Sequence, residues 1–257
     1  MKTLRSFFMI VNYKTFIITF LSLVSTYLCH ENGLIANFPL TLISLAIVFP
    51  IVFSINSAYK RREKALEHYA VVKGHLIGIF YASWDWVNYS PNPYPQLFVQ
   101  QFEQNIKAIR NLLMQEENRS LEYDKQVYVE FDKLSKLIQQ LREIGLNASE
   151  ISRVNQYLSK AIVSFETMRN IAYYRTPITL RAYSKVFIYF FPIIYGSYFA
   201  YTFSEYEAHL AYMMPVVYCF ILVSLTNIQE FLEHPYDKIG EDDIKFDIRK
   251  ITEILNP

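Results

Sequence analysis

Lysine and arginine are absent from two long windows of this sequence, residues 15–59 and 186–237. A helix needs roughly 20 apolar residues to cross a bilayer, so each window has room for two crossings and a short turn. The average composition, with a net charge of +1, would pass for a soluble protein, but apolar and charged residues are segregated along the chain. This segregation predicts two hydrophobic hairpins with a charged domain between them.

Other absences narrow the class of function. The sequence has two cysteines, each inside an apolar run, which argues against paired structural disulfides. It has no phosphate-binding glycine loop, no Gly-x-Ser-x-Gly elbow and no Cys-x-x-Cys motif. The five histidines form no pair at metal-ligand spacing, and the near-neutral charge argues against nucleic acid as the main partner. We therefore expect neither an enzyme nor a nucleic-acid-binding protein, and no zinc site.

Four apolar stretches fit membrane crossings: residues 15–29, 38–55, 186–201 and 208–226. The turn between the first two contains Gly33, which suits the positive φ that such turns need, and the turn between the last two is acidic. Neither turn contains a basic residue, whereas Lys60, Arg61 and Arg62 follow the second crossing. Since basic residues mark the cytoplasmic side, we expect a multi-pass protein of the cell (inner) membrane with both termini in the cytoplasm.

The middle of the chain, residues 57–185, is predicted to be wholly helical. Apolar residues recur there at steps of three and four, as on the buried stripe of an amphipathic helix. The two clearest stripes are Val99, Phe102, Ile106, Ile109 and Leu113, and then Val127, Phe131, Leu134, Ile138 and Leu141. Gly145 is placed to end the second helix, and Ser149 to cap the next one. Three prolines between Ser90 and Pro95 predict a loop.

These patterns predict an all-α membrane protein in which a cytosolic helical bundle separates two transmembrane hairpins. The cytosolic helices are expected to continue the transmembrane ones along a shared axis. Four crossings leave little room for a pathway within one subunit, so a central pore would form between subunits of a symmetric ring. The predicted divisions are residues 1–56 (N-terminal segment and first two crossings, with the candidate pore helix at about 38–55), 57–185 (cytosolic helical domain), 186–228 (last two crossings) and 229–257 (cytosolic acidic segment and helix).

Three segments of the sequence resemble the bestrophin family of ring-forming ion channels. Residues 53–61, FSINSAYKR, match the family's Phe-Arg-x-Asn-x-x-Tyr-x-Arg exit from the pore-lining helix. Residues 176–178 match its Thr-Pro-Ile segment, and residues 233–236 with 240–243 match its Glu-Asn-Pro-Phe-Gly element and the acidic residues that follow. Order and spacing agree over nearly the whole chain. The sequence is therefore similar to a distant, bacterial member of this family, and the resemblance implies a homo-oligomeric, pentameric channel.

The sequence also departs from the family pattern. Ser54 stands where the family has an arginine, Arg62 stands where it has a tryptophan, and two extra residues separate Tyr236 from Gly240. The resemblance implies conduction of small ions, with chloride or other anions favoured, but the lost arginine weakens that implication. A monovalent cation channel of the same family and a non-conducting, membrane-anchored scaffold remain alternatives.

Leu45, Phe49 and Phe53 are spaced by four residues, so they lie along one face of the second crossing. At the matching positions of the family, hydrophobic residues form the narrow neck of the pore, and such a ring can gate by dewetting. The alternative is that these residues only face lipid or neighbouring helices. Pro50 removes a backbone hydrogen bond beside Phe49 and is expected to bend the helix there, or else to be a tolerated membrane proline without a special role.

Asn56, Tyr59 and Arg61 form the predicted exit of the pore helix. The basic residues within 60–64 either anchor the helix at lipid headgroups or attract anions into a cytosolic vestibule. The acidic outer turn, residues 204–207, would instead concentrate cations. The two ends of the predicted pore therefore favour ions of opposite sign.

Glu241, Asp242, Asp243 and Asp247 form an acidic cluster after the fourth crossing. The resemblance implies a calcium clasp, because animal members bind calcium in this region and calcium takes several oxygen ligands. The spacing fails the EF-hand pattern, and acidic residues also favour the N-terminus of a following helix, which is predicted over 244–255. We favour the capping role, so no cofactor is expected unless calcium binds these carboxylates. The expected partners are further copies of the chain, the lipid bilayer and permeant ions.

Overall fold

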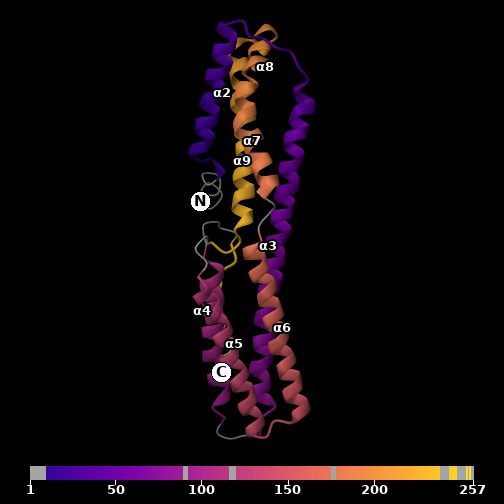
Figure 1. Cartoon of the computed structure of the whole chain (residues 1–257), viewed down its shortest axis with the longest axis vertical. Helices are drawn as coiled ribbons and strands as arrows, with labels where there is room; N and C mark the ends of the chain where they lie inside the picture. Colours follow the sequence, from indigo (N-terminus) through magenta and orange to yellow (C-terminus); the bar gives the residue numbers. More distant parts are fainter. Residues whose placement is uncertain are drawn as a thin grey trace. The chain divides into compact units, whose positions relative to one another are not determined.

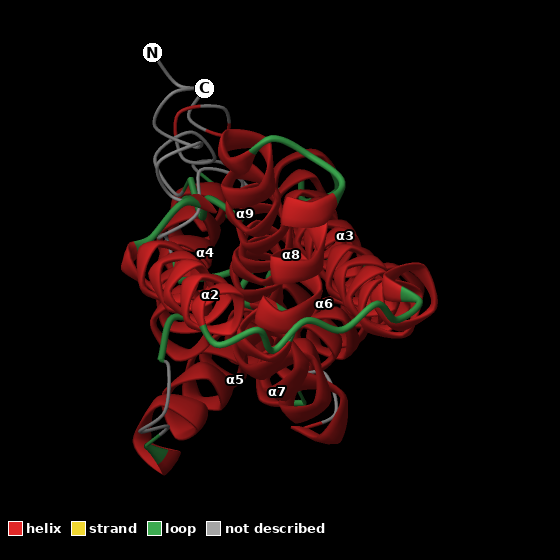
Figure 2. Ribbon diagram, turned by 90° about the horizontal axis from the view of Figure 1, so that it is seen from above, coloured by secondary structure: helices red, strands yellow, loops and turns green. Residues whose placement is uncertain are grey.

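The computed structural model describes residues 10–88, 92–115, 120–174, 178–237 and 243–247, together with Glu253 and Leu255. Its helices, in chain order, are α2 (Tyr13–Glu31), α3 (Leu40–Asp85), α4 (Tyr94–Leu113), α5 (Leu121–Glu143), α6 (Ala148–Tyr173), α7 (Ile178–Ile194), α8 (Gly196–Tyr201), the 3-10 helix η1 (Thr202–Ser204) and α9 (Ala208–Glu233) (Figure 1). The described residues contain no β-strand, and the elements labelled in Figure 2 are all helices. The all-α prediction is confirmed.

The chain divides into two compact units. We call Met1–Lys60 with Arg175–Glu233 the hairpin unit, and Arg61–Tyr174 with His234–Pro257 the bundle unit. The boundary falls within α3, which is one unbroken helix of 46 residues. The second predicted crossing and the start of the predicted cytosolic domain are therefore parts of the same helix.

Local signals fix both ends of α2. The side chain of Asn12 caps the first turn: it accepts hydrogen bonds from the N–H groups of Lys14 (3.0 Å) and Thr15 (3.4 Å), and the Thr15 N–H also donates to the Asn12 carbonyl (3.0 Å). After Glu31 the chain turns, and Gly33 has φ 65°, a backbone conformation that side chains disfavour. The predicted positive φ at Gly33 is confirmed.

The core of the hairpin unit is a cluster of apolar side chains from α2, α3, α7, α8 and α9. Its buried members are Ile18, Ile47, Ile51, Ile188, Tyr195, Phe199, Cys219, Leu222 and Val223. The same unit also buries small polar side chains, namely Thr15, Ser22, Thr26, Ser54, Thr202 and Thr226. Two of the helices, α3 and α9, contain windows long and apolar enough to cross a membrane.

The third predicted crossing, residues 186–201, is not one continuous helix. The helix α7 begins earlier, at Ile178, and a break at Tyr195 separates it from α8. Two hydroxyl groups of α2 take part in this break: Ser22 donates to the carbonyl of Pro192 (2.8 Å), and Ser25 donates to that of Ile193 (2.6 Å). Hydroxyl groups from a neighbouring helix can satisfy carbonyls that a helix break leaves without partners, which explains how the break is tolerated.

Gly196, the first residue of α8, lies directly against α2. A Cβ atom at this position would collide with the hydroxyl of Ser25 and lie 2.8 Å from the backbone carbonyl carbon of the same residue. Only glycine fits here, and small residues at a helix contact let two backbones approach closely. The contact brings the end of α7 within reach of the α2 hydroxyl groups.

The bundle unit has a separate apolar core, contributed by α3, α4, α5, α6 and the C-terminal segment. Every residue of the two predicted stripes, Val99 to Leu113 and Val127 to Leu141, is buried in it. Gly145 has φ 102° and follows α5 closely, as predicted. The amphipathic pattern alone was therefore sufficient to identify the buried faces of α4 and α5.

Two predicted helix starts in the bundle unit were wrong by a few residues. Asn147, not Ser149, caps α6: its side chain accepts a hydrogen bond from the Ser149 N–H at 3.2 Å. The proline-rich loop ends sooner than expected, because α4 already begins at Tyr94 and Pro95 occupies its first turn. Proline is tolerated there, since the first-turn N–H groups lack helical acceptors in any case.

The helix predicted to begin at Ile244 does not begin there. Residues 244–247 are not helical, whereas Glu253 and Leu255 are. Burial alternates along the segment: Ile244 and Phe246 are buried, whereas Lys245 and Asp247 are exposed. This period of two is typical of extended chain. The Ile244 N–H donates to the Pro235 carbonyl (2.9 Å), and Phe246 packs edge-on against Tyr69 at 4.8 Å.

Candidate pore-lining face

The first part of α3 presents two different faces. Ile47, Ile51 and Ser54 are at most 1% exposed and point into the core of the hairpin unit. Leu45, Phe49 and Phe53 lie on another face and are 44%, 55% and 63% exposed. The predicted single face is therefore present in the structure, and the described residues leave about half of it exposed. We call Leu45, Phe49 and Phe53 the neck face.

The neck face is continuous along the helix. The rings of Phe49 and Phe53 stack with centroids 6.3 Å apart and planes 22° apart, and Val52 beside them is 47% exposed. A contiguous exposed apolar surface marks a contact with another protein, with membrane or with both. Three aligned apolar residues offer no group that could carry out acid–base or nucleophilic chemistry, so this face can bind or exclude but cannot catalyse.

Other helices of the hairpin unit also expose large apolar side chains. The exposed residues are Tyr13, Phe16, Ile17, Phe20, Leu21, Val24, Tyr27 and Leu28 on α2, Tyr183, Val186, Phe190 and Ile194 on α7, and Met213, Met214, Val216, Val217 and Ile221 on α9. This surface is much larger than the scattered apolar residues of a water-soluble surface. An apolar exterior around buried hydroxyl groups is what a bilayer environment favours.

The three residues predicted at the exit of the pore helix do not share one environment. Asn56 and Tyr59 are exposed on α3 in the hairpin unit. Arg61, in the bundle unit, donates from Nη2 to the carbonyl of Ile171 at 2.6 Å. This carbonyl is among the last of α6, where carbonyls lack helical donors, so Arg61 helps to cap that helix. The sequence pattern gave no indication of this structural role.

Ser54 explains one departure from the family pattern. Its side chain is fully buried in the hairpin unit, on the face of α3 that packs against the core. An arginine at this position would need a partner for its charge in an apolar surrounding, which is costly. Serine is small enough to fit without one. The position that carries the family's arginine is therefore part of the packing in this chain, not part of the exposed face.

The acidic cluster is only partly described. Glu241 and Asp242 lie outside the described residues, whereas Asp243 is half-buried and Asp247 is exposed. Within the described part of the chain, no three metal-ligating side chains come together. Burial, followed by the negative charge of Asp247, raises the pKa of Tyr69 to about 12. Neither the calcium clasp nor the capping of a helix at Ile244 has support from these contacts.

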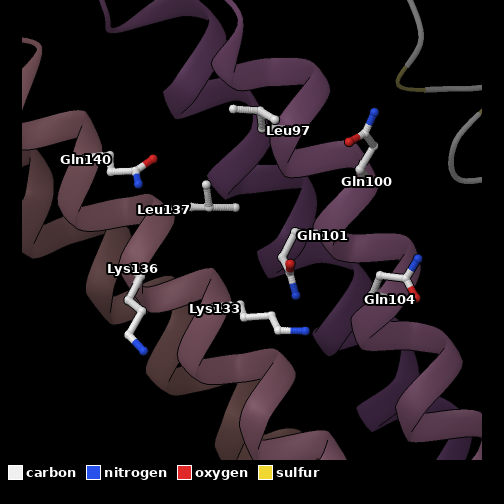
Figure 3. A pocket seen from close by; sticks show the side chains of 8 residues that line it. All are labelled: Leu97, Gln100, Gln101, Gln104, Lys133, Lys136, Leu137 and Gln140. Carbon is white, nitrogen blue, oxygen red and sulfur yellow. The ribbon is translucent and has the colours of Figure 1, made fainter.

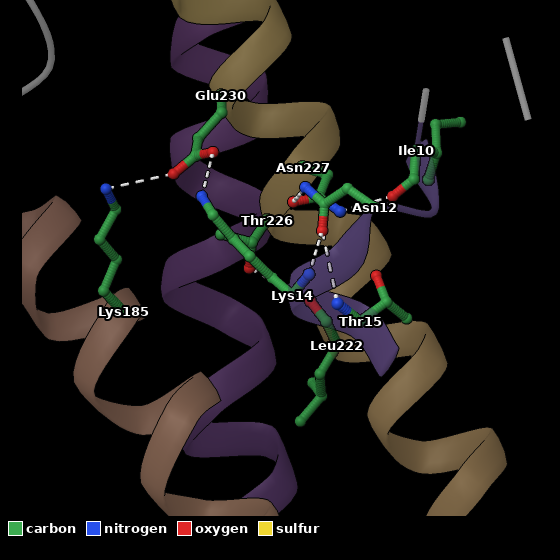
Figure 4. A network of polar contacts seen from close by, with 9 residues as sticks. All are labelled: Ile10, Asn12, Lys14, Thr15, Lys185, Leu222, Thr226, Asn227 and Glu230. Atoms are coloured by element: carbon green, nitrogen blue, oxygen red, sulfur yellow. Dashed lines mark hydrogen bonds and ion pairs between the residues drawn. The ribbon is translucent and has the colours of Figure 1, made fainter. Parts of the chain in front are cut away.

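A polar network that sequence reasoning missed joins α2, α7 and α9 of the hairpin unit (Figure 4). Glu230 of α9 pairs with Lys185 of α7 (3.1 Å) and with Lys14 of α2 (3.4 Å). Beside it, Asn12 donates to the side chain of Asn227 at 3.1 Å. The two lysines border the lysine-free windows in the sequence, which was the available signal. Their common carboxylate partner depends on how the helices pack and could not be inferred.

The bundle unit carries a shallow groove of about 430 Å³ between α4 and α5 (Figure 3). It is lined by Leu97, Gln100, Gln101, Gln104, Lys133, Lys136, Leu137 and Gln140. Lys136 pairs with Asp132 (2.6 Å), and Lys133 pairs with the buried carboxylate of Glu130 (2.9 Å). Glu130 also accepts hydrogen bonds from Gln101 and Gln126. The charged side chains of the groove are therefore paired within the protein, and the groove offers no uncompensated charge to a ligand.

The segments that carried the resemblance are partly visible. Thr176 and Pro177 lie outside the described residues. Glu233 is the buried last residue of α9, and Tyr236 is buried in the bundle unit, where its hydroxyl donates to the Met168 carbonyl at 3.4 Å. The Glu-x-Pro-aromatic element thus contributes two anchored side chains, one to each unit.

Solved structures of similar fold cover nearly the whole chain. A bacterial bestrophin homologue from Klebsiella pneumoniae matches with a TM-score of 0.79 and 14% identity, over 95% of this chain and 96% of its own. A variant of that homologue matches with a TM-score of 0.81 and 13% identity, over 94% and 97%. A structure described as a membrane protein matches with a TM-score of 0.79 and 14% identity, over 95% and 96%. No protein-family model and no curated protein matches the sequence. The chain therefore has the fold of the bacterial bestrophin homologues.

Proposed function

We propose that this protein is a homo-oligomeric ion channel whose pore narrows at the neck face of Leu45, Phe49 and Phe53. The observation that carries the proposal is that these three side chains are 44–63% exposed in a single chain, although each is large and apolar. A ring of copies would bring their neck faces together around a central axis. Ions passing such a dry constriction lose hydration that its walls do not replace, so small movements of α3 can open or close it.

Self-assembly follows from the same argument. One copy offers a single pore-lining helix, so the pathway is complete only when several copies share an axis, as in a closed symmetric ring. The number five comes from the resemblance to bestrophins. A chain that is monomeric in mild detergent would support the alternative, a membrane-anchored scaffold that binds a partner through the bundle unit.

The hairpin unit is proposed to lie in the membrane, and the bundle unit in the cytosol with both termini. The exposed apolar side chains of α2, α7 and α9 support the first assignment, and the basic residues at 60–64 support the second. On this assignment the crossings fall within residues 1–56 and 186–228, the cytosolic domain is 57–185, and the segment 229–257 is also cytosolic. The membrane is the cell (inner) membrane.

The permeant ions are proposed to be small anions such as chloride. The resemblance and the basic residues near the exit of α3 favour anions, whereas the exposed Glu205 and Glu207 of the outer turn favour cations. Calcium at the acidic cluster is a secondary proposal that rests on the resemblance alone. A calcium titration of current and of thermal unfolding tests it, with Asp243→Ala as the variant that should abolish any effect.

The test of the function is the reversal potential of purified protein in a planar bilayer under a potassium chloride gradient. A shift towards the chloride equilibrium potential is the expected result. A shift towards the potassium potential would establish the cation channel instead and point to Glu205 and Glu207 as candidate selectivity residues. The absence of current from a correctly assembled oligomer would contradict the channel proposal and favour the scaffold.

A further inference from the structure

Pro50 removes one backbone hydrogen bond from α3, the helix that carries the neck face. It lies within α3, directly after Phe49. Proline has no N–H, so the carbonyl four residues earlier, that of Ala46, loses its helical donor. This carbonyl belongs to the turn between Leu45 and Phe49. In a membrane there is no water to replace the missing donor, so another protein group must supply one.

A tyrosine of a different helix meets this carbonyl. The hydroxyl of Tyr183, on α7, donates to the carbonyl oxygen of Ala46 at 3.4 Å. Both residues belong to the hairpin unit. The tyrosine therefore reaches the one carbonyl of α3 whose donor Pro50 removes. Random contact between two apolar helices would not be expected to select this atom.

The ring of Tyr183 is held in place by a column of aromatic side chains. Its centroid lies 4.2 Å from that of Phe187, which lies 4.9 Å from Phe191, which in turn lies 5.4 Å from Tyr195. Tyr183, Phe187 and Phe191 are four apart and so share one face of α7, and Tyr195 follows them at the break after this helix. Tyr195 is fully buried in the core of the hairpin unit. The hydroxyl of Tyr183 is thus carried on a packed column that begins in the core.

We infer that Tyr183 is a positioning residue for the neck: its hydroxyl replaces the hydrogen bond that Pro50 removes and holds the turn of α3 that carries Leu45 and Phe49. The inference rests on the proposed function, in which these residues line a pore. An O–H···O distance of 3.4 Å is longer than the usual range, so a slight rotation of α3 or α7 either breaks or tightens the bond. The contact couples movement of α7 to the width of the neck.

A double-mutant cycle tests the inference. Pro50→Ala restores an N–H that can donate to the Ala46 carbonyl, and the tyrosine hydroxyl then becomes redundant. We expect Tyr183→Phe to change the ratio of open to closed channels by about fivefold in the natural background, the size expected when one hydrogen bond belongs to only one of two states. In the Pro50→Ala background the same substitution should change the ratio by less than about twofold. The sign reports whether the bond belongs to the conducting or to the closed state.

The matched control is Tyr27→Phe, which removes an exposed hydroxyl of α2 that makes no hydrogen bond to the described residues. It should leave the ratio unchanged in both backgrounds. Equal effects of Tyr183→Phe in both backgrounds, or no effect in either, would overturn the inference while the channel proposal stands.

Thermal unfolding of the natural protein, the two single variants and the double variant separates the inference about Tyr183 from the proposed function. If the natural protein carries no current, the channel proposal fails, and the unfolding cycle still tests the contact. A loss of Tm on Tyr183→Phe that disappears in the Pro50→Ala background supports the replacement of the missing hydrogen bond. Additive changes of Tm would refute it.

Discussion

The hairpin unit and the bundle unit differ in where they place their phenylalanine side chains. The bundle unit buries Phe98, Phe102 and Phe165 completely and places lysine–carboxylate pairs on its surface, such as Lys107 with Glu103. The hairpin unit exposes Phe16, Phe20, Phe53 and Phe190 by 60% or more and buries hydroxyl groups. The hydrophobic effect requires the first arrangement in water. The second arrangement fits apolar surroundings, such as a bilayer or the apolar faces of further copies of the chain.

The largest expected effect is the loss of a core side chain from the bundle unit. Phe165→Ala removes a fully buried ring of α6 and should lower the free energy of unfolding by about 3–5 kcal/mol. Val163 lies two residues away on the same helix, and its side chain is 64% exposed. Val163→Ala should therefore change the free energy of unfolding by less than about 0.5 kcal/mol. Denaturant unfolding of both variants measures the difference. Equal losses would mean that the assigned inner face of α6 is wrong.

A charge on the outer face distinguishes the two units directly. Phe20→Lys places a lysine on the exposed face of α2, where a bilayer would oppose it by roughly 2.5–3.5 kcal/mol near the helix centre. Val163→Lys places the same charge on an exposed position of the bundle unit, where it should be nearly neutral. The yield of assembled protein in the membrane fraction is the measurement. Equal tolerance of the two variants would contradict a membrane environment for the hairpin unit.

Two glycines sharpen the comparison at the level of packing. Gly196→Ala forces a Cβ into the backbone of α2, which should destabilise the hairpin unit by about 1–3 kcal/mol. Gly74→Ala meets nothing within 4 Å in α3 and should stabilise the helix by roughly 0.5–1 kcal/mol. The Tm values of the two variants in detergent should therefore move in opposite directions. A Gly196→Ala protein as stable as the natural one would show that the α2–α8 contact is looser than described.

The smallest expected effect is on acid stability of the bundle unit. Burial alone would raise the pKa of Glu130, but hydrogen bonds from Lys133, Gln101 and Gln126 and the charge of Lys133 outweigh it and lower the pKa below 4.5. The stabilisation is therefore present above pH 4.5 and is lost as the pH falls through the lowered pKa. In the Glu130→Gln variant, the free energy of unfolding should therefore fall less steeply as the pH is lowered through this range. An unchanged pH dependence of the free energy of unfolding would assign the acid sensitivity to other carboxylates.

Patterns along a single helix were predictable from the sequence. The buried stripes of α4 and α5 follow from steps of three and four residues, and the positive φ of Gly33 and Gly145 follows from the need to turn the chain. The placement of Leu45, Phe49 and Phe53 on one face of α3 follows from their spacing by four residues.

Features that depend on contacts between distant segments were not predictable. The break at Tyr195 is tolerated because α2 presents Ser22 and Ser25 to it, and the sequence around Tyr195 does not reveal those partners. Arg61 caps α6 through a residue far along the chain. The extended segment after Asp243 was misread as helix, although the alternation of Ile244 and Phe246 with charged residues was visible in the sequence.

The neck face of α3 is proposed to line an ion pathway. The most direct test is the block of current by a membrane-impermeant thiol reagent in a background without Cys29 and Cys219. Phe49→Cys should be blocked as the reagent enters the open pore, whereas Phe190→Cys, equally exposed on α7, should not respond. Block at Phe190→Cys together with no block at Phe49→Cys would contradict the claim and assign the pathway to another helix.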